Sequence, residues 1–78
     1  MITTKILEND EFPYRIQFNG LYGIAKSPSS AVIRALHVGG KVPHRLKNRN
    51  TIRKYILNTY SIDRDWVYIT QILEEDKF

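Results

Sequence analysis

The sequence predicts an α+β fold: an antiparallel sheet of about four strands with two helices packed on one face. Three observations support this prediction. Several short segments alternate apolar and polar residues, two others repeat apolar residues at helical spacing, and an Asn-Gly pair separates two alternating segments. The expected order is strand, strand, strand, helix, helix, strand. We expect one domain over residues 1–78, with a basic connection at 39–50 and a short acidic tail at 74–78.

The first strands are expected at residues 2–7, "ITTKIL", and 14–18, "YRIQF", because both alternate. Between them, "ENDEFP" (8–13) is rich in acids and turn formers, which favours an exposed connection. Asn19 and Gly20 predict a two-residue type I′ turn, since this turn needs positive φ at both central residues. Such a turn would pair Phe18 with Leu21, Ile16 with Gly23, and Tyr14 with Ala25. The small partners would leave room for a helix on that face.

The stretch "SPSSAVIRALHVGG" predicts the first helix. Ser27 can cap its start, Pro28 suits the first helical position, and Gly39 or Gly40 can take the left-handed conformation at its end. The apolar stripe of this helix would consist of Ala31, Val32, Ala35 and Leu36, with Ser30, Arg34 and His37 outside it. We expect Arg34 to be a solvated position and His37 to be favoured by the helix dipole.

A second helix is expected over "TIRKYILNTY" (51–60), with Asn50 as its cap, because apolar residues recur there at helical spacing. Pro43 has no backbone donor and disfavours helix at the residue before it, so the stretch that precedes this helix should be a connection.

The last segment is expected to be a strand. "SIDRD" (61–65) has the composition of a turn, and "WVYITQIL" (66–73) is dense in β-formers. Its apolar residues would fall on both faces, which is typical of an interior strand or of an edge that meets a partner.

The composition indicates a small, soluble, intracellular protein. Of the 78 residues, 42% are hydrophobic, and none is cysteine, which excludes disulfides and thiolate metal sites. The N-terminal stretch lacks the pattern of a signal peptide, and no apolar run is long enough to cross a membrane. We therefore expect a cytoplasmic location, in the host cytoplasm if the protein is phage-encoded, and a monomer or small homo-oligomer.

The sequence gives no support for an enzyme, a metal site or a cofactor. His37 and His44 have no partner at the spacing of a zinc-binding helix, and the chain contains neither a "GxSxG" elbow nor a complete phosphate-binding loop. We expect a protein that is not an enzyme and that holds no cofactor.

Positive charge is concentrated in residues 41–54, which we call the basic segment. It holds six basic residues and no acid, whereas residues 1–40 hold four basic and three acidic residues and residues 55–78 hold two and five. Like charges repel one another, so an anionic partner would relieve this crowding. A solvated loop is the simpler interpretation of the same run.

We expect the basic segment to bind nucleic acid, with RNA or single-stranded DNA favoured over duplex, because Lys and Arg displace counterions from phosphates. Tyr22 is the expected stacking group. The candidate binding residues are Lys41, His44, Arg45, Lys47, Arg49, Asn50, Arg53, Lys54 and Tyr22. Asn50 and the free N–H groups at the start of the second helix would add anion ligands.

A second interpretation keeps the charge and changes the target. The same basic face would suit a protein-binding modulator or inhibitor, of the kind that phages encode, docked on an acidic partner protein. The sequence leaves this alternative open.

Overall fold

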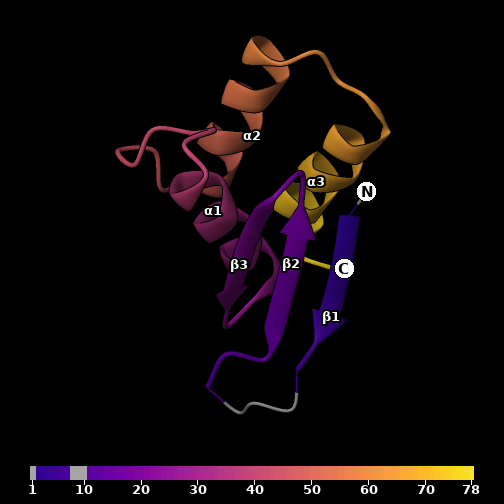
Figure 1. Ribbon diagram of the computed structural model, residues 1–78. Coiled ribbons are helices and arrows are strands. Elements are labelled where there is room, and N and C mark those ends of the chain that lie inside the picture. Colours follow the sequence, from indigo (N-terminus) through magenta and orange to yellow (C-terminus); the bar gives the residue numbers. More distant parts are fainter. Residues whose placement is uncertain (1, 8–10) are drawn as a thin grey trace.

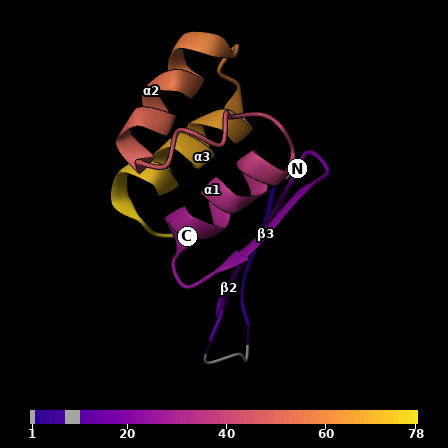
Figure 2. The ribbon, with the colours of Figure 1, turned by 90° about the vertical axis from the view of Figure 1, so that its left-hand side faces the viewer.

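The computed structural model describes residues 2–7 and 11–78, so part of the expected connection at 8–13 lies outside the described residues. The chain forms a three-stranded antiparallel sheet followed by three helices, which is an α+β fold (Figure 1). The elements are β1 (Ile2–Ile6), β2 (Tyr14–Phe18), β3 (Leu21–Ala25), α1 (Pro28–Val38), α2 (Arg49–Thr59) and α3 (Arg64–Glu75). The helices lie on one side of the sheet (Figure 2).

The β2–β3 hairpin has the predicted register. Phe18 faces Leu21, and the pairs that follow are Ile16 with Gly23 and Tyr14 with Ala25. Asn19 (φ 46°) and Gly20 (φ 77°) both have positive φ, as a type I′ turn requires. β1 pairs with β2 on the other side, so the strand order is β1-β2-β3.

α1 packs directly on β2 and β3 because Gly23 has no side chain. A Cβ at Gly23 would lie 2.1 Å from the carbonyl oxygen of Ala31. The predicted caps are confirmed: the Ser27 hydroxyl accepts from the Ser30 N–H, and Pro28 begins the helix. Gly40 (φ 72°) ends it in a Schellman motif, in which the Gly40 N–H donates to the His37 carbonyl and the Lys41 N–H donates to the Leu36 carbonyl.

The prediction of a final strand at residues 66–73 is wrong, because residues 64–75 form α3. The Asp63 carboxylate accepts a hydrogen bond from the Trp66 N–H at 2.9 Å and so starts a helix in the segment expected to be a turn. The buried residues of this helix recur at a period of 3.6: Trp66, Ile69, Thr70, Ile72 and Leu73. This spacing and the cap outweigh the β propensity of the side chains.

α2 begins two residues earlier than expected. Its cap is Asn48 and not Asn50, since the Asn48 side chain accepts from the N–H groups of Asn50 and Thr51. Asn48 has extended backbone angles, which a capping residue adopts. The basic connection is therefore shorter than the predicted 39–50.

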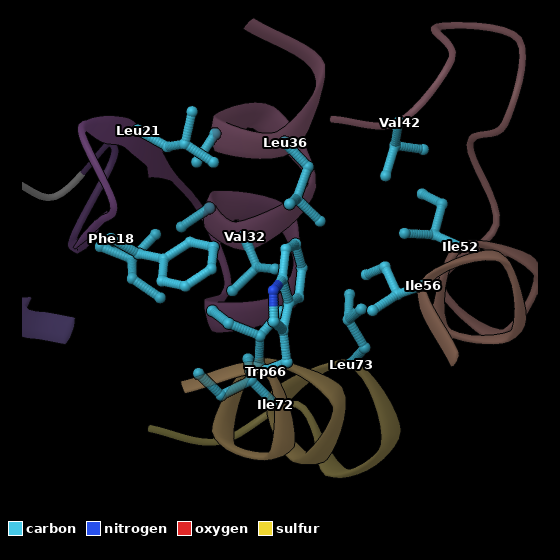
Figure 3. Close-up of a cluster of buried hydrophobic side chains, with 14 of the residues drawn as sticks. Phe18, Leu21, Val32, Leu36, Val42, Ile52, Ile56, Trp66, Ile72 and Leu73 are labelled. Carbon is cyan, nitrogen blue, oxygen red and sulfur yellow. The ribbon is translucent and has the colours of Figure 1, made fainter. Parts of the chain in front are cut away.

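Side chains from the sheet, all three helices and the connection share one core (Figure 3). Trp66 packs edge-to-face on Phe18 with ring centroids 5.0 Å apart. The segment expected to be an acidic tail belongs to this structure: residues 74 and 75 complete α3, and the Phe78 ring packs on Tyr14 at 5.7 Å. Within the described residues, no helix is long and apolar enough to span a membrane.

Candidate binding site

The connection between α1 and α2 is held in place by its own contacts. Val42 is buried in the core, and the Tyr60 hydroxyl donates a hydrogen bond to the carbonyl of Lys41. The Leu46 N–H donates to the Pro43 carbonyl at 3.0 Å, which closes a turn. His44 and Arg45 lie within this turn and are exposed. Figure 2 shows the connection returning along α1 to reach the start of α2.

Between the connection and the outer side of α1 lies a pocket of about 470 Å³ that is open to solvent. We call it the basic pocket. Its lining residues are Ser30, Ile33, Arg34, His37, Val38, His44 and Lys47. None of these residues is acidic, and four of them carry a cation or an imidazole. The basic pocket is therefore suited to an anionic ligand.

Two histidines join α1 to the connection. The His37 Nε2–H donates to the Leu46 carbonyl at 2.7 Å, because a carbonyl oxygen can only accept. The His37 ring stacks on His44, with centroids 4.9 Å apart and an angle of 23° between the planes. His37 is half-buried and His44 is exposed, so the stack presents His44 to solvent.

Arg34 contributes to the basic pocket from the side nearer the sheet. Its Nη1 donates to the Ile24 carbonyl at 3.2 Å, on the outer edge of β3, and its guanidinium lies 5.9 Å from the centre of the Phe12 ring. These contacts orient the guanidinium while its side chain stays exposed. One hydrogen bond uses one of the five N–H donors of an arginine.

Sequence reasoning did not include Arg34 and His37 among the binding residues. Both lie outside the apolar stripe of α1, three residues apart, and Ser30 shares their side of the helix. This spacing indicates a polar face on α1. That this face lines a pocket depends on the connection, which runs back along α1, and the sequence does not show this.

The basic segment does not stay together in the fold. Lys47 lines the basic pocket, and Lys41 and Arg45 belong to the connection that forms it. In contrast, the Arg53 guanidinium lies 3.4 Å from the Glu74 carboxylate, and that of Arg49 lies 3.8 Å from Asp76. The end of α3 thus supplies acids to α2. Two of the six cations of the basic segment are thus paired with acids of the same chain, so these two arginines do not need an external anion to offset their charge.

The remaining candidates on α2 are Asn50 and Lys54, which are both exposed. The N–H of Asn50 donates to the Asn48 side chain at 2.9 Å, and that of Thr51 donates to the same oxygen at 3.3 Å. Two of the helix-start N–H groups expected to bind an anion are therefore occupied by the cap.

Tyr22 lies on the opposite face of the sheet from α1, because its neighbour Gly23 faces the helix. Its ring is exposed, and the Arg15 guanidinium lies 4.9 Å from the ring centre. The structure therefore does not bring Tyr22 to the basic pocket, and its candidate stacking surface is separate.

Within the described residues, no group of three His, Asp or Glu side chains is placed to hold a metal ion. The chemistry available at the basic pocket is thus that of hydrogen-bond donors, positive charge and imidazole rings beside a small apolar surface from Ile33 and Val38.

Searches with this chain against models of protein families, against curated proteins and against solved structures give no match.

Proposed function

We propose that this protein binds nucleic acid without catalysing a reaction, and that it prefers RNA or single-stranded DNA to duplex. The observation that carries the proposal is the basic pocket, where α1 and the connection bring Arg34, His37, His44 and Lys47 together with no acid among the lining residues. Lys41 and Arg45 extend the positive charge along the connection.

The number of lysine and arginine residues at this surface predicts how strongly binding should depend on salt. There are four of them: Arg34, Lys41, Arg45 and Lys47. Within the described residues, no carboxylate pairs with Lys41, Arg45 or Lys47, and Arg34 bonds to a backbone carbonyl. Each phosphate contact to a single strand releases about 0.7 counterions, so four contacts give a slope of about −3 in a plot of log affinity against log salt.

The shape of the surface supports single strands. The basic pocket is concave and lies between a helix and a returning connection, and an unstacked base can reach such a depression, whereas a base inside a duplex cannot. Exposed imidazole is among the groups on which RNA-binding proteins stack bases.

The alternative function is docking on an acidic partner protein. The observation that favours it is Val38, which is 75% exposed at the rim of the basic pocket. Protein interfaces combine an apolar centre with a polar rim, and Val38 among the cations of the pocket offers a small surface of this kind. Binding to a cellular partner that survives nuclease treatment would support this alternative.

Fluorescence anisotropy tests the proposal. Labelled RNA, single-stranded DNA and duplex of equal length are titrated at about 50 and 200 mM salt. The paired substitution Arg45→Gln and Lys47→Gln should weaken RNA binding roughly tenfold. It should also reduce the magnitude of the salt slope by about 1.4, since two phosphate contacts are lost. The matched control is Arg64→Gln with Lys5→Gln, which removes the same charge from α3 and β1.

Flat titrations at the lower salt concentration would exclude nucleic-acid binding. Equal losses in the paired variant and its control would show that binding depends on overall charge and not on this surface.

A further inference from the structure

The basic pocket is open to solvent and large enough to receive a small ligand. Its volume of about 470 Å³ falls in the range of small-ligand sites, roughly 300–1,000 Å³. The lining combines apolar side chains, Ile33 and Val38, with charged ones, Arg34 and Lys47. A nucleotide has the same division, between a flat base and a phosphate.

Arg34 and Lys47 are suited to bind the phosphate of a nucleotide. Arg34 is oriented by its bond to the Ile24 carbonyl, which leaves other N–H groups of the guanidinium for a bidentate contact. Lys47 faces the same pocket from the connection and adds a second positive charge. An anion between them neutralises two cations that line one depression.

The stacked rings of His37 and His44 offer a surface on which a base can pack. His37 is fixed by its hydrogen bond to the Leu46 carbonyl, and His44 rests on it. The two rings are therefore oriented without a ligand, and a base can stack on the exposed His44 ring in this arrangement. Ile33 and Val38 supply the apolar contact.

We propose that the basic pocket holds a single nucleotide of the bound strand, with its phosphate on Arg34 and Lys47 and its base against His44, Ile33 and Val38. This inference rests on the proposed function and narrows it. A free nucleoside monophosphate should then bind the same pocket, since both halves of the recognition lie within one unit.

The test compares adenosine 5′-monophosphate, adenosine and inorganic phosphate by amide chemical shifts of the ¹⁵N-labelled full chain. The monophosphate should shift the amides of residues 30–38 and 44–47 in a saturable manner. It should bind about tenfold more tightly than adenosine, which lacks the phosphate, and than phosphate, which lacks the stacked base.

Substitutions separate the two halves. Lys47→Gln should reduce binding of the monophosphate and leave that of adenosine unchanged, whereas His44→Ala should reduce both. Arg64→Gln, on α3, is the control for the loss of one charge. Arg34→Gln should resemble Lys47→Gln, and its melting temperature must also be measured because Arg34 bonds to β3.

The outcomes distinguish this inference from the proposed function. Oligonucleotide binding without saturable shifts from the monophosphate would overturn the nucleotide site and leave the proposed function intact. Binding of the monophosphate in the pocket without oligonucleotide binding would overturn the proposed function and would limit the pocket to free nucleotides. Equal affinity for the monophosphate and phosphate would overturn the inference in favour of a simple anion site.

Discussion

The rings of Tyr60 and Trp66 stack with their centroids 4.7 Å apart and their planes 10° from parallel. Tyr60 follows α2 and Trp66 lies in the first turn of α3, so the stack joins the two helices at their connection. Because the Tyr60 hydroxyl also donates to the Lys41 carbonyl, the same side chain fixes the start of the connection that forms the basic pocket.

This arrangement predicts a pH dependence of stability. Burial, with a smaller contribution from Tyr55, raises the pKa of Tyr60 above its ordinary value of 10.0. A raised pKa means that the folded state favours the neutral phenol. The hydroxyl therefore makes its full contribution to the free energy of unfolding below pH 10. This contribution is lost as the pH rises through the pKa of Tyr60 in the folded state.

Tyr60→Phe isolates this contribution. The variant should be less stable than the wild type by about 0.5–1.5 kcal/mol below pH 10, since it lacks the hydrogen bond to Lys41. The difference should shrink at higher pH. Urea unfolding of both proteins across this range measures it, and a difference that stays constant with pH would contradict the prediction.

Gly23→Ala should destabilise the fold by about 1–3 kcal/mol, because overpacking forces the backbones apart. The added Cβ would lie 2.1 Å from the Ala31 carbonyl oxygen and 2.9 Å from the Ala35 nitrogen, and both are backbone atoms of α1. Gly20→Asn is the control, since a Cβ at Gly20 meets open space and Asn tolerates positive φ. Similar melting temperatures for the two variants would contradict the close contact between α1 and β3.

Asp76 joins all three helices, and its substitutions should separate backbone, hydrogen-bond and charge effects. Its carboxylate accepts from the Ser29 N–H at 2.7 Å in α1 and lies 3.8 Å from Arg49 in α2, and its φ of 58° is left-handed. Asp76→Asn keeps an acceptor and tolerates this conformation, so it should cost less than about 1 kcal/mol.

Asp76→Ala loses the acceptor and places an alanine at positive φ, so it should cost about 2 kcal/mol or more in urea unfolding. Equal losses for the Asn and Ala variants would show that the charge, and not the hydrogen bond to Ser29 or the backbone conformation, determines the effect.

Arg53→Gln should leave nucleic-acid affinity nearly unchanged, within roughly twofold, although Arg53 belongs to the basic segment. Its guanidinium lies beside Glu74 and away from the pocket lining. Anisotropy with labelled RNA, with Lys47→Gln measured beside Arg53→Gln under the same salt conditions, gives the contrast. A loss equal to that of Lys47→Gln would show that α2 takes part in binding.

Local sequence was enough to predict the hairpin and the first helix. Asn19 and Gly20 set the register, because few residue types adopt positive φ and a type I′ turn needs it at two consecutive positions. Ser27 and Pro28 set the start of α1, because a helix cap acts within one turn. These features depend on residues that are close in the chain.

The final helix was missed because the chemical type of its side chains was weighed above their spacing. Val67, Tyr68 and Ile69 are β-formers, but Asp63 caps the segment and the buried positions follow a helical period. Asp63 is a capping residue that the sequence itself shows, although the stretch around it has the composition of a turn.

By itself, the sequence determined the α+β class, the hairpin register, the cap of α1 and the excess of positive charge between residues 41 and 54. Only the tertiary structure decided which of those charges stay available. Acids from the end of α3 return to Arg49 and Arg53, while the turn of the connection brings Lys47 and His44 to Arg34 and His37. Capping and turn geometry act over a few residues, whereas charge pairing depends on how distant segments pack.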